Sequence, residues 1–118
     1  MNPNRVELTA TIAAAQSLSD AIALDRNWLV SLALPAAWTT AVLTFQGSND
    51  TGTPAAWLDL YNETGEIVLS SAAASRGLVL PPALVHGWRW VRLRSGTAAA
   101  PVAQTATRLI TCGIRQFA

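Results

Sequence analysis

The segment Thr40-Ala41-Val42-Leu43-Thr44-Phe45-Gln46 alternates between two kinds of side chain. Ala41, Leu43 and Phe45 would point to one side of an extended chain, and the residues between them would point to the other. Because successive side chains of a β-strand face opposite sides of the sheet, this period of two predicts a strand with one face on a core. Residues 47–54 follow with the sequence Gly-Ser-Asn-Asp-Thr-Gly-Thr-Pro, a composition typical of a loop.

The same alternation recurs along the chain and predicts further strands at residues 6–14, 28–34, 57–61, 66–70, 88–95 and 108–116. Asn62-Glu63-Thr64-Gly65 joins two of these segments as a β-hairpin. Three other segments, 13–15, 72–74 and 81–85, suit single helical turns but are too short for stable helices. We therefore predict an all-β fold, a single antiparallel, jelly-roll-like β-sandwich of about seven or eight short strands.

The composition of the 118-residue chain narrows its classes of partner. We expect one domain over residues 1–118, with residues 1–5 as a polar N-terminal arm. Charged residues make up 13% of the chain, against about 25% in an average soluble domain, and the net charge is +1. A nearly neutral chain has no electrostatic footprint for nucleic acid, so we predict no nucleic-acid partner. No apolar run reaches the length of a membrane helix and no secretory signal is evident, which predicts synthesis in a cytoplasm and no membrane association.

The residues available for chemistry are few. His86 is the single histidine and Cys112 the single cysteine, and no nucleophile elbow, phosphate loop or dinucleotide fingerprint occurs. We therefore predict that the chain is not an enzyme and has no cofactor or metal centre. Ser48, Asn49 and Asp50 offer closely spaced oxygen atoms, which suit either a calcium or loop-ligand site or ordinary turn hydrogen bonds.

Tryptophan is abundant, with five residues, and two of them belong to the segment Trp88-Arg89-Trp90-Val91-Arg92-Leu93-Arg94. Alternation places the aliphatic residues on one face and Trp88, Trp90, Arg92 and Arg94 on the other. Trp and Arg are enriched at the centres of protein interfaces, so these residues and Trp57 form the candidate interface. Two alternatives are tryptophans that pack beneath a loop and a stacking platform for a sugar or a single nucleic-acid strand.

Several segments carry a resemblance to a known family. These segments are Leu-Ser-Asp-Ala-Ile-Ala-Leu at 18–24, Pro-Ala-Ala-Trp-Thr-Thr-Ala-Val-Leu-Thr-Phe-Gln-Gly-Ser-Asn-Asp at 35–50, Trp-Leu-Asp-Leu-Tyr at 57–61 and Trp-Val-Arg-Leu-Arg-Ser-Gly-Thr at 90–97. Together they resemble small structural proteins of tailed bacteriophages and prophages, and their layout is similar to a discoidin or galactose-binding-like jelly roll.

The resemblance implies a virion component, made in the cytoplasm of a host bacterium. We expect a capsid decoration (cement) protein that binds the major capsid protein of the assembled head, as a homo-oligomer with a trimer as the working assumption. The alternative is a carbohydrate-binding or adsorption module of a tail or head fibre, with a glycan as ligand.

Overall fold

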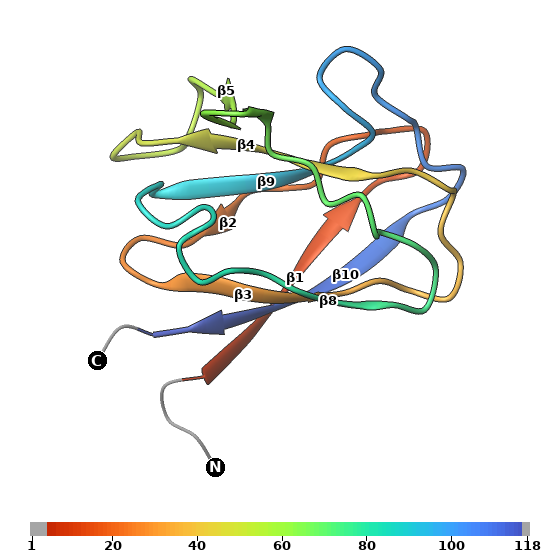
Figure 1. Cartoon of the computed structure of the whole chain (residues 1–118), viewed down its shortest axis with the longest axis horizontal. Coiled ribbons are helices and arrows are strands. Elements are labelled where there is room, and N and C mark those ends of the chain that lie inside the picture. The colour runs from red at the N-terminus through yellow and green to blue at the C-terminus, as the bar shows by residue number, and fades with distance from the viewer. Residues whose placement is uncertain (1–4, 117–118) are drawn as a thin grey trace.

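The computed structural model describes residues 5–116, and within this range the chain forms β-strands and no helix (Figure 1). The strands are β1 (Arg5–Ile12), β2 (Ile22–Ala23), β3 (Trp28–Ala33), β4 (Leu43–Ser48), β5 (Leu58–Asp59), β6 (Tyr61–Asn62), β7 (Gly65–Glu66), β8 (Gly77–Val79), β9 (Trp90–Ser95) and β10 (Arg108–Arg115).

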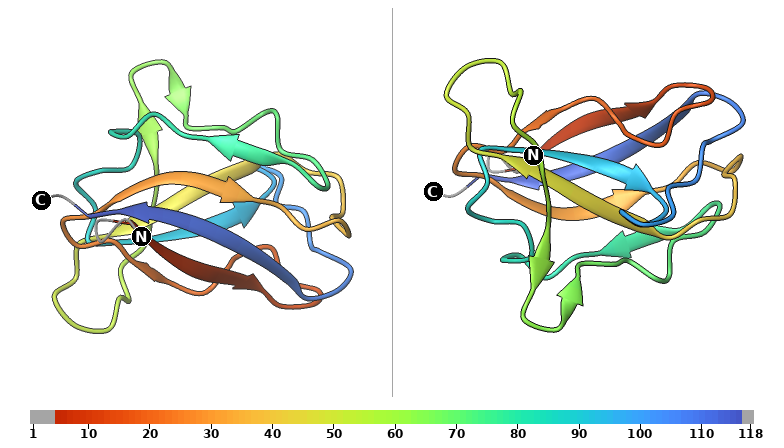
Figure 2. Two further views of the ribbon diagram at one scale, coloured as in Figure 1. Left: turned by 90° about the horizontal axis from the view of Figure 1, so that it is seen from below. Right: turned by 90° about the horizontal axis from the view of Figure 1, so that it is seen from above.

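The strands form two stacked four-stranded sheets and a separate hairpin (Figure 2). One sheet has the order β1-β10-β3-β8 and the other the order β2-β9-β4-β5, and every pair is antiparallel. The chain alternates between the two sheets from β1 to β4 and again from β8 to β10. The last strand, β10, pairs with the first strand, β1. With the β6–β7 hairpin set aside, this is the strand order of a jelly roll. The predicted all-β sandwich is confirmed.

The core lies between the two sheets and consists of aliphatic side chains from both. Leu43 and Phe45 of β4 are completely buried, as the alternation of their segment predicted. In the opposite sheet, Ile110 and Cys112 of β10 are also completely buried. Burial of each such large side chain is worth about 1.5–3 kcal/mol, so the two inner faces supply most of the driving force for folding.

Strand β4 begins and ends later than its sequence suggested. The prediction covered residues 40–46, whereas β4 extends through Ser48 because Gly47 and Ser48 continue the ladder opposite Val91 and Trp90 of β9. The predicted loop therefore begins at Asn49. Glycine and serine are common in loops, but a paired neighbour strand overrides that local preference.

A β-bulge in β3 changes which of its residues are buried. Strict alternation would have placed Trp28, Val30 and Leu32 on one face. The register shifts between Gly113 and Ile114 of β10, so that the backbone of β3 contains one extra residue at this point. Leu29 and Leu32 are consequently the buried residues of the strand, since a bulge moves every following side chain to the other face.

The irregular segments differ most from the prediction. Residues 57–61 and 66–70 do not form long strands but contribute the short strands β5, β6 and β7, and β2 and β8 were not predicted. The predicted hairpin is confirmed, with Tyr61 opposite Glu66. None of the three predicted helical turns forms a helix. Ala15 instead adopts a positive φ of 66° in a turn, and the Leu84 amide closes a turn by donating to the Pro81 carbonyl at 3.0 Å.

The predicted N-terminal arm lies mainly outside the described residues. Its last residue, Arg5, is the first residue of β1 and pairs with Arg115 in the backbone ladder. Along the described part of the chain there is no helix of the length and apolar character that a membrane crossing requires.

Candidate binding surface

The outer face of the β2-β9-β4-β5 sheet carries the polar row that the sequence predicted. Residues Trp90, Arg92 and Arg94 of β9 pair in the ladder with Ser48, Gln46 and Thr44 of β4. The alternate residues Val91 and Leu93 of β9 are completely buried in the core. The predicted division of this strand into an aliphatic and an Arg/Trp face is thus correct from Trp90 to Arg94.

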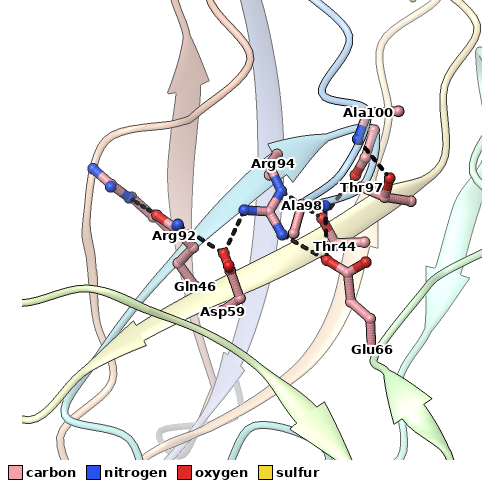
Figure 3. Close-up of polar contacts among 10 residues, drawn as sticks. Thr44, Gln46, Asp59, Glu66, Arg92, Arg94, Thr97, Ala98 and Ala100 are labelled. Carbon is pink, nitrogen blue, oxygen red and sulfur yellow. Dashed lines mark hydrogen bonds and ion pairs between the residues drawn. The ribbon is translucent and has the colours of Figure 1, made fainter.

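Arg94 is the centre of a polar network on this face (Figure 3). Its Nη1 donates to Asp59 at 2.6 Å and its Nη2 donates to Glu66 at 2.6 Å, while its Nε donates to the Thr44 hydroxyl at 3.0 Å. Only 5% of the residue is exposed. Two carboxylates thus neutralise a buried guanidinium, and this arrangement fixes β5 and β7 against β9.

The network continues along the sheet to Arg92. Gln46 donates to Asp59 at 2.9 Å and accepts a hydrogen bond from Arg92 Nε at 2.8 Å (Figure 3). The hydrogen bond from Arg94, followed by that from Gln46, lowers the pKa of Asp59 below its ordinary value. Partial burial, with a smaller contribution from Arg94, lowers the pKa of Arg92.

Arg92 also stacks on an aromatic ring. Its guanidinium carbon lies 4.3 Å from the ring centroid of Trp57, in the segment that leads into β5. Cation–π stacking of this kind favours a fixed guanidinium and leaves its nitrogen edges open to further hydrogen bonds. Trp57, Arg92, Gln46 and Asp59 therefore lie together as one half-exposed surface.

Trp88 does not belong to this outer face, which corrects the prediction. It precedes β9, and its ring packs against the core. A Cβ atom built on Gly47 would lie 2.8 Å from Trp88 Cδ2, so the ring passes directly beside the backbone of β4. Alternation failed here because β9 begins only at Trp90, and the two residues before it follow a bend.

Ser48, Asn49 and Asp50 hold their own loop in place. Asp50 Oδ2 accepts hydrogen bonds from the amides of Ala55 and Ala56, which lower the pKa of this carboxyl group. The Ser48 hydroxyl accepts from the Asp50 amide, and the Asn49 side chain accepts from the Arg89 amide. Among residues 5–116, no group of three or more His, Cys, Asp or Glu side chains is placed to hold a metal ion. The hydrogen bonds of these three residues are those that the turn interpretation predicted.

His86 and Cys112, the other residues considered for chemistry, lie in separate places. His86 Nε2 accepts a hydrogen bond from Trp28 Nε1 at 3.2 Å. Cys112 is buried, and burial raises the pKa of its thiol to about 12. A thiol with so high a pKa remains protonated and unreactive at neutral pH.

The structure also contains a buried arginine that the sequence reasoning missed. Arg108, the first residue of β10, is only 9% exposed and is surrounded by Gln104, Thr39 and Thr105. The signal was available, because Arg108 shares the parity of the apolar residues Ile110 and Cys112 and should therefore face inward.

The outer face of the other sheet has few charged residues, and they lie at one end of it. Its residues, which we call the open face, follow from the ladder registers and are Glu7, Thr9, Thr11, Trp28, Ser31, Ala33, Gly77, Val79, Leu109, Thr111, Gly113 and Arg115. Glu7 and Arg115 are the charged residues among them, and both lie at the end of the sheet where Glu7 pairs with Gly113. Val79 is 91% exposed and Leu109 is 58% exposed, so no other segment in the described range covers them.

Comparison with known proteins gave no matching family model, curated protein or solved structure.

Proposed function

We propose that this chain is a structural protein of a bacteriophage virion that binds the assembled capsid through its open face. The observation that carries the proposal is the open face itself, where small and β-branched side chains surround the exposed residues Val79 and Leu109. Charged residues are depleted at the centres of protein interfaces, and this composition fits such a centre. The resemblance to tailed-phage structural proteins supports the choice of a capsid as the partner.

The open face suits a protein partner better than the Trp/Arg face does. Arg94 is already neutralised within the chain, and Arg92 already stacks on Trp57, so docking there would disturb existing interactions. Nucleic acid is a poor partner for the open face, because phosphate binding requires several arginines or lysines, whereas Arg115 is the basic residue of the face and lies at its end, near Glu7. A flat, neutral protein lattice remains the best complement.

A binding module of this kind would act by mass action. It stabilises the assembled shell if it binds the lattice and not the free subunits, and many weak copies act together on a symmetric surface. The proposal includes a homo-oligomer of the chain, with a trimer as the working assumption. Light scattering of the purified chain measures its oligomeric state in solution.

Co-sedimentation with assembled heads and with free coat protein tests the proposal. We expect binding to heads only, and we expect Val79→Asp and Leu109→Asp each to weaken it at least about tenfold, because a charge must then be desolvated in the interface. Tyr61→Asp is the matched control, since Tyr61 is 62% exposed but lies on β6, away from the open face. Equal binding of all three variants, or immunogold labelling that finds no chain on the particles, would reject the proposal.

A carbohydrate-binding or adsorption module is the second candidate function. The observation that favours it is the half-exposed surface of Trp57, Arg92, Gln46 and Asp59, which combines an aromatic ring with planar polar groups. A glycan array tests it, with Trp57→Ala and Trp90→Ala expected to lose any signal that Val79→Asp retains. Absence of signal at high protein concentration would reject this candidate.

A further inference from the structure

Two arginines are buried to a similar degree in this fold, but only one of them has an anionic partner. Arg94 is 5% exposed and forms ion pairs with Asp59 and Glu66. Arg108 is 9% exposed and, within residues 5–116, has no carboxylate within ion-pair distance. Because an enclosed charge without a counter-charge is costly, the guanidinium of Arg108 is a favourable place for an anion.

Neutral oxygen atoms hold the Arg108 guanidinium on two of its three nitrogens. Nε donates to Gln104 Oε1 at 3.1 Å, and Nη2 donates to the hydroxyls of Thr39 and Thr105 at 3.2 and 3.1 Å. No hydrogen bond within the described residues involves Nη1. This atom is also not among the fully enclosed polar atoms that lack a partner, so it keeps access to solvent. Nη1 is therefore the guanidinium nitrogen that has no partner among the described residues and is not completely enclosed.

The two hydroxyls add a further donor beside this nitrogen. Thr39 Oγ1 and Thr105 Oγ1 lie 3.3 Å apart, so the contact between them uses one of their two protons. Both oxygens accept from Arg108, which leaves the remaining hydroxyl proton free to donate to an outside acceptor. Thr105 is exposed, and the cluster therefore opens to solvent on its side.

A buried glutamine makes the cluster rigid. Gln104 is completely enclosed; its Oε1 accepts from the Thr39 amide and from Arg108, and its Nε2 donates to the Thr39 carbonyl and the Ser95 hydroxyl. All hydrogen-bonding groups of its amide are thus used, and the guanidinium is fixed before a ligand arrives. Preorganised donors bind an anion without paying for the ordering of flexible side chains.

We propose that Arg108, together with the hydroxyls of Thr39 and Thr105, forms a binding site for a single oxyanion, a carboxylate or a phosphate group. The planar guanidinium group matches the geometry of both oxyanions. Hydrogen bonds from its charged N–H groups to an oxyanion are stronger than hydrogen bonds between neutral groups. The site lies in a different cluster from the open face and is independent of the proposed function.

Titration of the ¹⁵N-labelled chain tests the site. Sodium phosphate, sodium acetate and sodium chloride are added separately at constant ionic strength, and the Arg108 Nε–Hε signal and the Thr39 and Thr105 amides are followed by NMR. We expect saturable shifts with phosphate, acetate or both, and none with chloride. Tighter binding of acetate points to an acidic side chain or chain terminus of another polypeptide, whereas tighter binding of phosphate points to a phosphate group.

Substitutions separate this site from general salt effects. Thr105→Ala removes one donor from an exposed position and should weaken binding about tenfold, while Thr111→Ala, an exposed threonine on the open face, should leave binding unchanged. Arg108→Gln should abolish binding; if that variant does not fold, Thr105→Ala still decides the question. Shifts that fail to saturate with either oxyanion, or that persist in folded Arg108→Gln, would overturn the proposal.

Discussion

Gly47 lies where β4 passes beside Trp88, and the structure leaves no space for a side chain there. A Cβ atom on this residue would lie 2.8 Å from Trp88 Cδ2 and 3.0 Å from Leu60 Cδ2. We expect Gly47→Ala to lower the free energy of unfolding by about 1–3 kcal/mol, because the packed side chains must shift to admit the methyl group. Urea unfolding followed by tryptophan fluorescence measures this change.

Gly77 on β8 is the matched control for this substitution. A Cβ atom at Gly77 meets no heavy atom within 4 Å, and the residue is exposed. Gly77→Ala should therefore change the free energy of unfolding by less than about 0.5 kcal/mol. If the two variants proved equally stable, the close packing of Trp88 against β4 would be wrong.

Asp59 makes stability depend on pH in the acid range. Its pKa in the folded state is below the ordinary value of 3.8, because Arg94 and then Gln46 donate hydrogen bonds to its charged form. The carboxylate therefore contributes stability above pH 3.8, and this contribution is lost as the pH falls through the folded-state pKa. Thermal unfolding over a pH series should show a smaller acid loss for Asp59→Asn than for the parent chain. If the two chains lost stability equally as the pH falls, the hydrogen bonds from Arg94 and Gln46 would not stabilise the charged form of Asp59.

Among the strands, those with long alternation could be predicted and the shortest could not. β4, β9 and β10 each bury at least two apolar residues at every second position, so their existence and their inner faces could be predicted from the sequence. β2 and β8 contain two and three residues, too few to display a period. Their backbones are extended because β9 and β3 offer edges to pair with, which is tertiary information.

The β6–β7 hairpin depends on Glu66 for its attachment to the sandwich. Glu66 Oε2 accepts hydrogen bonds from Arg94 at 2.6 Å and from the Ala98 amide at 2.9 Å. Glu66→Gln keeps the shape but removes the charge, so we expect the hairpin to open more often while the sheets stay intact. The Ile67 amide, which donates to Leu60, should exchange with deuterium at least about tenfold faster, since a hydrogen bond to a charged group is worth about 1.5–3 kcal/mol.

Asp25→Asn provides the control for loss of a carboxylate charge. Asp25 pairs with Arg89 at 3.3 Å, but its side chain is 70% exposed, and an exposed pair contributes little. The exchange rate of the Ile67 amide should be unchanged in this variant. Equal rates in Glu66→Gln and the parent chain would show that the hairpin is held by other contacts.

Across the whole molecule, the sequence predicted the face on which polar residues lie but not the partners they meet there. Arg94 was correctly placed outside the core, yet it contacts Asp59 and Glu66, which precede it by 35 and 28 positions. Arg108 likewise depends on Thr39, 69 positions earlier. Such pairs are set by the crossings between the sheets and by the resulting register. Local periodicity contains no information on the crossings or on the register. An arginine that forms an enclosed ion pair therefore has the same sequence pattern as an arginine that is exposed.

The core around β10 must open before Cys112 can react, and this makes the thiol a probe of the sandwich core. Cys112 lies on β10, between β1 and β3, and is fully buried with its thiol pKa raised to about 12. Opening of the β6–β7 hairpin leaves it enclosed, because neither hairpin strand pairs with β10. We therefore expect a thiol reagent at neutral pH to label the native chain at least about a thousandfold more slowly than the unfolded chain. In the double variant Cys112→Ala, Thr111→Cys, the neighbouring position points outward and should label rapidly. Rapid labelling of Cys112 itself would mean that the sheets part, or that β1 leaves β10, without global unfolding, and the core would then not be closed in the native chain.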